Sequence, residues 1–278
     1  MPDRRVLRAA AALVVIAAAG VLAPWLAPYD PAAQLDIVQL KNAAPSVTHW
    51  LGTDPYSRDI LSRAVFGART SLTVAALATL LATIIGCAWG VWAASVRESL
   101  GDALMSVVDV MRSVPRVLLF LAVAVLLGPL SATTLALMLG TTAWTGTSRL
   151  VYVLVREVSA RPFVEAARSI GASQWRLLRR HVAPQLLSPV AASGALLLAD
   201  ILAVESGLSF IGLGVRPPAA SWGGMLQDGL PYLRSAWWLT AVPSALLIAT
   251  VLSAAGIADR LDASQMRRTS QTNDRATP

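Results

Sequence analysis

The chain has 278 residues, of which 55% are hydrophobic and only 14% are charged, and its net charge is +7. Ordinary soluble domains hold about 25% charged residues, so this composition is typical of a membrane protein. One cysteine and two histidines leave too few ligands for a disulfide framework or a Cys/His zinc site. Lys41 is the only lysine and Asn42 follows it, which excludes a P-loop. We therefore expect this chain to bind no cofactor and no metal, and not to hydrolyse ATP by that route.

The apolar residues gather in six blocks, and a helix needs about 20 such residues to cross a bilayer. The pattern predicts an all-α, polytopic membrane protein with six transmembrane helices. The first block follows Arg4 and Arg5, and its apolar core exceeds the roughly 7–15 residues of a secretory signal peptide, so we expect an uncleaved anchor. The expected spans are residues 6–26, 72–96, 113–127, 133–151, 187–213 and 236–258.

An even number of spans places both termini on one side of the membrane. If that side is cytoplasmic, 17 of the 23 Lys and Arg residues lie on cytoplasmic segments and 6 on external ones. Cytoplasmic loops retain positive charge, so both termini are expected in the cytoplasm, and the net charge needs no nucleic acid partner. The expected organisation is an N-terminal span with an external loop (1–71), a five-helix core (72–260) that contains a cytoplasmic loop (152–186), and a disordered tail (261–278).

The expected cytoplasmic loop carries the signals of two short helices. Pro162 suits the first turn of a helix, Gly171 permits a break, and Ser173 can cap a second helix. Pro184 is expected to stop that second helix, because proline lacks the N–H that a helix interior uses. The sequence therefore predicts two short helices around a glycine elbow.

Three functions fit such a basic helical segment on physical grounds. Trp175 with Arg179 and Arg180 suits a helix that lies on anionic lipid. Two helices around a glycine turn also have the outline of a DNA-binding helix-turn-helix, but the membrane spans on both sides would block access to a groove. The third possibility is a helix that docks into a groove of a cytoplasmic partner.

The motif Glu165-Ala166-Ala167, with Gly171 and the tetrapeptide at 181–184 behind it, resembles the EAA loop of permease subunits of bacterial binding-protein-dependent ABC importers. Ala183 departs from the family pattern, which usually has leucine there. The resemblance implies that this loop is a coupling helix that sits in a cleft of an ATPase subunit. The implied docking residues are Glu165, Ala166, Ala167, Arg168, Gly171, Ala172, Trp175, Arg179, His181 and Pro184.

Three further stretches resemble the second permease type of the dipeptide, oligopeptide and nickel importers. They are PWLAPYDP at 24–31, LGTDPYSRDILSR with GARTSL at 51–72, and GLSFIGLGV with SWGGML at 207–226. Ser57 stands where the family usually has glycine. The resemblance implies a subunit of the bacterial inner membrane that contacts lipid, pairs with a second homologous permease, binds two ABC ATPase subunits that hold ATP and magnesium, and receives solute from an external binding protein.

Two carboxylates lie inside the fifth apolar block, at Asp200 and Glu205. A charged side chain at mid-membrane costs about 2.5–3.5 kcal/mol on insertion scales, so each should face a cavity, water or a partner. With Ser209 they either line a translocation path or are bonded between helices. The alternative function is a proton-coupled secondary transporter that uses both carboxylates as a relay. That class is typically built from inverted repeats, and no second copy of the fifth-block pattern is evident.

Overall fold

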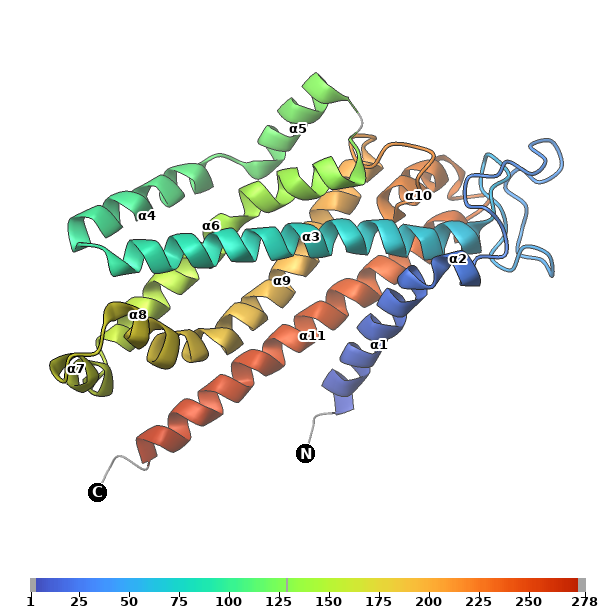
Figure 1. Cartoon of the computed structure of the whole chain (residues 1–278). Helices are drawn as coiled ribbons and strands as arrows, with labels where there is room; N and C mark the ends of the chain where they lie inside the picture. The colour runs from blue at the N-terminus through green and yellow to red at the C-terminus, as the bar shows by residue number, and fades with distance from the viewer. Residues whose placement is uncertain (1–3, 129, 275–278) are drawn as a thin grey trace.

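The computed structural model describes residues 4–128 and 130–274, and no strand occurs within these ranges (Figure 1). The predicted all-α fold is confirmed, and helices contain most of each apolar block. The helices are α1 (Arg4–Val21), α2 (Ala23–Leu26), α3 (Ile60–Ser95), α4 (Glu98–Ser113), α5 (Arg116–Leu127), α6 (Ala132–Ser159), α7 (Pro162–Ser169), α8 (Gln174–Leu177), a π-helical turn (Leu178–Val182), α9 (Ala183–Phe210), α10 (Trp222–Gly229), a 3-10 turn (Leu230–Tyr232) and α11 (Trp238–Asp274).

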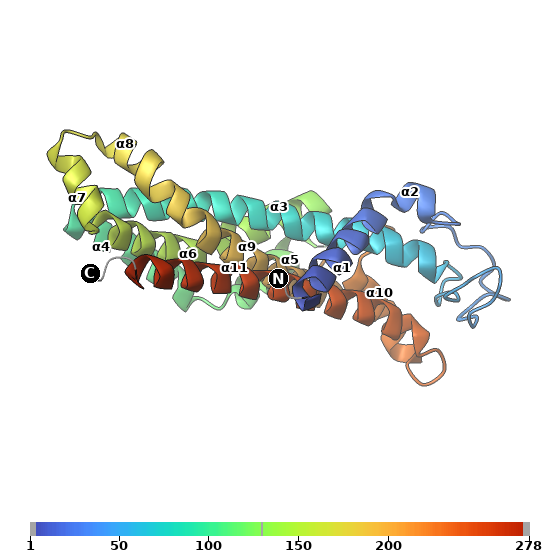
Figure 2. The same cartoon turned by 90° about the horizontal axis from the view of Figure 1, so that it is seen from below.

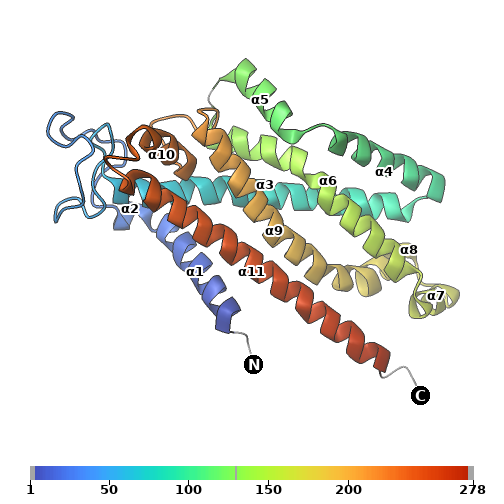
Figure 3. The ribbon, with the colours of Figure 1, turned by 180° about the vertical axis from the view of Figure 1, so that it is seen from behind.

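The long helices α3, α6, α9 and α11 form a bundle, and α1 packs on α3 and α11 (Figures 1 and 3). Small residues let α3 and α6 approach closely, because a Cβ at Gly86 would lie 2.7 Å from Thr147 and one at Gly90 would lie 2.6 Å from the Ser148 carbonyl oxygen. Close contact of this kind stabilises helix pairs where no hydrophobic effect acts between them. The loop 27–59 and α10 lie at one end of the bundle, whereas α7, α8 and the C-terminal end of α11 lie toward the other (Figure 2).

Three helical segments are long and apolar enough to cross a membrane: Ile60–Ser95, Gln174–Phe210 and Trp238–Leu261. The first and fourth predicted spans lie on α1 and α6, which are not among these three segments, and the third differs further from expectation. A break at Val114 and Pro115 separates α4 from α5, because the proline disfavours a helical conformation in the residue before it. The 12 residues of α5 rise only about 18 Å, which is too short for a bilayer of about 30 Å.

Pro184 does not end a helix, contrary to the sequence prediction. The chain passes from α8 through the π-helical turn into α9 without interruption, and Ala183 N–H donates to the Leu178 carbonyl across this turn. The wider turn accommodates the proline, which lies in the first turn of α9 and removes no hydrogen bond from an α-helix interior. The second short helix of the cytoplasmic loop and α9 therefore form one continuous helix from Gln174 onward.

The C-terminal segment from residue 261 is predicted from sequence to be a disordered tail. Helix α11 continues to Asp274, and residues 275–278 lie outside the described part of the chain. The added stretch is free of Gly and Pro and contains the helix formers Leu, Ala, Gln, Met and Arg, which explains its conformation.

Helix α10 packs on α9 through a glycine, which gives a first testable prediction. A Cβ at Gly223 would collide with the Ser206 carbonyl oxygen and would lie 2.7 Å from Ser209 Cβ. We expect Gly223→Ala to lower the free energy of unfolding by about 1–3 kcal/mol, the usual cost of overpacking. Gly224→Ala is the matched control, because its Cβ would meet only the Ser221 hydroxyl, at 3.2 Å. Thermal unfolding in detergent measures both, and equal midpoints for the two variants would contradict the prediction.

Candidate functional site

Residues 162–184, here called the docking element, adopt the predicted helix, elbow and second helix. Pro162 lies in the first turn of α7, and Gly171 has φ = +87°, a left-handed conformation that favours glycine. The Gly171 N–H donates to the Arg168 carbonyl at 3.0 Å and closes the first helix. The Ser173 side chain accepts from Arg176 N–H and begins the second. The sequence prediction is confirmed up to Leu177.

One face of the docking element is fixed to the bundle by apolar packing. Val164, Leu177 and Val182 are at most 3% exposed and pack in one cluster with valines of α6. The Arg161 guanidinium donates to Gln185 at the start of α9, at 2.9 Å, and to Glu157 of α6, also at 2.9 Å. These contacts hold the element against both long helices.

The opposite face of the docking element is open. Phe163, Ile170 and Trp175 are 44%, 88% and 68% exposed, a large apolar area for a water-facing loop. Among the docking residues implied by the resemblance, Ala167 and Ala172 instead pack against the buried cluster. Exposed among the implied residues are Glu165, Ala166, Arg168, Gly171, Trp175, Arg179 and Pro184, whereas Ala167, Ala172 and His181 are half-buried.

Asp200 points away from the core of this chain. Its side chain is 46% exposed and accepts a charge-assisted hydrogen bond from Arg116 at the start of α5, at 3.1 Å. Beside it, residues of α6 and α9 line a groove of about 210 Å³ that includes Thr147 and Ser193. The sequence indicated that Asp200 needed a cavity or a partner, and the structure supplies both.

Glu205 and Ser209 lie elsewhere, in the interior between α3, α9 and α10. Glu205 is fully buried and accepts hydrogen bonds from Ser209 at 2.8 Å, from Ser206 at 3.3 Å and from the Ser71 hydroxyl. Ser71 in turn accepts from the Trp222 backbone N–H at 3.3 Å. The carboxyl therefore joins three helices, and we assign Glu205 and Ser209 to packing in this conformation and not to a path surface. Of the cavity, water or partner expected beside this carboxylate, the structure supplies partners, and α10 keeps Glu205 from water.

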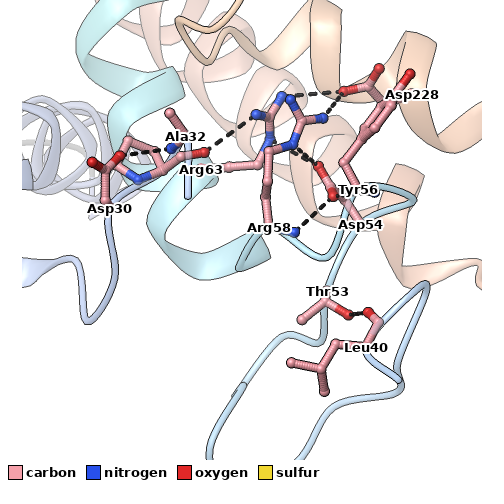
Figure 4. Close-up of polar contacts among 10 residues, drawn as sticks. Asp30, Ala32, Leu40, Thr53, Asp54, Tyr56, Arg58, Arg63 and Asp228 are labelled. Atoms are coloured by element: carbon pink, nitrogen blue, oxygen red, sulfur yellow. Dashed lines mark hydrogen bonds and ion pairs between the residues drawn. The ribbon is translucent and has the colours of Figure 1, made fainter. Parts of the chain in front are cut away.

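A buried ionic cluster fixes the loop 27–59 to α10 at the end opposite the docking element (Figure 4). Arg58 pairs with Asp54 at 2.6 Å and with Asp228 at 2.7 Å. Arg63 pairs with the same two carboxylates at 3.4 and 3.2 Å, and its side chain is only 5% exposed. Burial raises the pKa of the Asp228 carboxyl above its ordinary value, and the attraction of the two guanidiniums only partly offsets this rise.

The turn before α3 is equally well bonded. Asp59 caps α3 by accepting from Ser62 N–H at 2.8 Å, and its other oxygen contacts His49 Nδ1 at 2.9 Å. Ser57 has φ = +60°, a left-handed conformation that favours glycine. His181 lies in the docking element, at the far end of the bundle from His49. The described residues contain no group of three or more His, Cys, Asp or Glu side chains that could hold a metal ion.

Sequence reasoning missed two sets of functional residues. Arg116 is one of the 17 charges assigned to cytoplasmic segments above, whereas the structure pairs it with Asp200 of α9, 84 residues away. The pairing of Arg58 and Arg63 with Asp228 was also missed, because 170 and 165 residues separate the partners. The i,i+4 spacing of Asp54 and Arg58 was the one local signal for that cluster.

Comparison with known proteins agrees with this architecture. Residues 86–267 match the family described as "Binding-protein-dependent transport system inner membrane component". The dipeptide transport system permease protein DppC of Escherichia coli K12 is 34% identical over 258 residues, which cover 90% of this chain and 86% of the relative. DppC of Bacillus subtilis is 32% identical over 247 residues, covering 87% and 76%. The probable D,D-dipeptide permease DdpC of Escherichia coli K12 is 33% identical over 253 residues, covering 87% and 82%.

A solved structure shares the fold. An inward-facing chain of the MetNI methionine ABC transporter superposes with a TM-score of 0.59 at 20% sequence identity, covering 73% of this chain and 97% of that one. The family match spans more than half of the chain, and the relatives cover most of its length at over 30% identity. The chain belongs to the family of inner membrane components of binding-protein-dependent transport systems.

Proposed function

We propose that this chain is the permease subunit of an ATP-driven importer for dipeptides or similar small peptides. The observation that carries the proposal is the docking element, which has an open apolar face on one side and is fixed to α6 and α9 on the other. Several relatives are named dipeptide permeases, which supports the substrate class. The chain lies in the bacterial cytoplasmic membrane with both termini in the cytoplasm and hydrolyses no ATP itself.

The partners follow from the surfaces that this chain leaves open. An ABC ATPase binds the face of Phe163, Ile170 and Trp175, and the arginines around it meet acidic groups on that subunit. A second, homologous permease binds a second ATPase and covers the groove beside Asp200, because a charged pair and a broken helix are not stable against lipid. ATP and magnesium belong to the ATPase subunits. An external binding protein delivers the peptide to the end of the bundle that carries the loop 27–59.

Coupling uses the uninterrupted helix from the docking element into α9. Gln174 and Asp200 lie on one continuous helical segment and are about 40 Å apart along its axis. Closure of the ATPase dimer moves the docking element, and α9 carries that movement to the middle of the membrane. Because packing fixes the element to α6 as well, the two helices that line the groove move together. The path between the two permeases thereby opens to one side at a time.

The test is affinity purification of the full chain from its native membrane in a gentle detergent, with identification and stoichiometry of the proteins that accompany it. We expect a second permease and two P-loop ATPase subunits for each copy of this chain. Recovery as a homo-oligomer without an ATPase would overturn the proposal and would make the docking element a helix that lies on lipid.

The alternative of a proton-coupled transporter finds no support in the geometry. Asp200 is exposed and paired with Arg116, whereas Glu205 is buried among serines, so the two carboxylates face different surroundings on α9. They form no shared relay along this helix. The family to which the chain belongs depends on a binding protein.

A further inference from the structure

The pair Arg116–Asp200 lies at a place where the membrane-embedded part of the chain is least regular. Asp200 is ten residues before the end of α9, which places it about 15 Å from that end and near the middle of a hydrocarbon layer of about 30 Å. Arg116 begins α5 directly after the break at Val114 and Pro115, and all three residues are exposed. Non-helical backbone at membrane depth is tolerated where it lines a cavity or is covered by protein.

The surroundings have the size and polarity of half a binding site. The groove beside Asp200 measures about 210 Å³ and presents Thr147 and Ser193 together with apolar side chains of α6 and α9. Pockets for small molecules usually measure about 300–1,000 Å³, so one chain supplies a part of a site that a second permease completes. Asp200 lines this groove from α9, and Arg116 of α5 reaches its carboxylate at 3.1 Å.

We propose that Arg116 and Asp200 bind the two charged termini of a small peptide in the translocation path, and this inference rests on the proposed function. At neutral pH a free peptide carries a terminal carboxylate and, below a pKa of about 7.7–8.0, a terminal ammonium. The Arg116 guanidinium binds the carboxylate, and the Asp200 carboxylate binds the ammonium. When the path is empty, the two side chains pair with each other at 3.1 Å and leave no uncompensated charge.

The exchange of partners explains why a charged pair suits this position better than a neutral one. A zwitterion that crosses the membrane needs a positive and a negative group along its route, because its own charges lose water there. Separation of the pair leaves the Arg116 and Asp200 charges without a partner. The peptide carboxylate then pairs with Arg116, and the peptide ammonium pairs with Asp200. Each of the four charges then has a partner of opposite sign, and the barrier for a zwitterion falls relative to a peptide with one blocked end.

The experiment measures uptake of one radiolabelled dipeptide in three forms, free, N-acetylated and C-amidated, in membrane vesicles that hold the complete importer. We expect Asp200→Asn to lower uptake of the free and C-amidated forms about tenfold or more, with the N-acetylated form changed less than about twofold. Arg116→Gln is expected to do the converse: the free and N-acetylated forms fall, and the C-amidated form changes little. Arg116→Lys retains the charge and should retain more uptake than Arg116→Gln.

Glu98→Gln is the matched control, because Glu98 forms an ion pair between α4 and α6 at 2.8 Å, away from the groove. It should affect all three forms equally and weakly. Equal losses of all three forms in Asp200→Asn and Arg116→Gln, at normal membrane abundance, would show that the pair is structural and would overturn the inference. Unchanged uptake in both variants would also overturn it. If the unaltered importer shows no ATP-dependent uptake of the free dipeptide, the proposed function itself fails.

Discussion

Gly171→Val is expected to abolish ATP-driven uptake while the chain still inserts and reaches normal abundance in the membrane. Gly171 has φ = +87°, and a β-branched side chain disfavours this region strongly, whereas an ordinary residue pays about 1–2 kcal/mol. No atom lies within 4 Å of a Cβ built at this position, so a clash inside this chain is not the cause. The variant straightens the elbow between α7 and α8 and displaces the open face that an ATPase would contact.

Gly171→Asn is the matched control for that result, because asparagine tolerates the left-handed region and also adds a side chain at the same exposed position. Uptake in membrane vesicles should remain high in the Asn variant, be intermediate in Gly171→Ala and be lost in Gly171→Val. A bulky replacement of the exposed Glu165 should likewise abolish uptake without affecting insertion. Normal uptake in both Gly171→Val and the Glu165 variant would contradict the proposal that this element docks on an ATPase.

The docking element could be predicted from sequence because its signals are local. Pro162, Gly171 and Ser173 each determine the backbone of their own turn, and the structure places all three as expected. Pro184 was predicted wrongly because the sequence rule assumes an α-helix, whereas a π-helical turn accommodates the proline here. Such turns are rare, at well under 1% of residues, and carry no recognised sequence signature.

Features that depend on distant partners could not be predicted in the same way. The apolar content of α9 indicated that Asp200 required a partner, but nothing in the order of residues selects Arg116, 84 positions earlier. The third apolar block is a second feature that its own sequence did not predict correctly. Its composition predicts a span, yet Pro115 divides it, and the ion pair of Arg116 places the start of α5 beside Asp200.

The second large effect is expected at the ionic cluster that fixes the loop 27–59 to α10. Arg63→Met should lower the free energy of unfolding by about 3–5 kcal/mol, because it leaves Asp54 and Asp228 buried with one guanidinium instead of two. The long apolar part of methionine fills much of the same volume, so a cavity contributes little. The midpoint of thermal unfolding in detergent measures the effect. Arg234→Met, an exposed position near α10, is the control and should change stability by less than about 0.5 kcal/mol.

The pKa of Asp228 determines how this loss responds to pH and to a second substitution. Burial raises that pKa in the folded protein, so the folded state binds the proton more tightly than the unfolded state does, and protonation favours folding. Removal of the Arg63 charge raises the pKa further. The stability deficit of Arg63→Met should therefore be smaller in mildly acidic buffer than at neutral pH.

Adding Asp228→Asn should recover part of the deficit at neutral pH, since it removes one of the two carboxylates that Arg63 neutralised. A deficit that is independent of pH and unchanged by Asp228→Asn would show that Arg63 acts through packing alone.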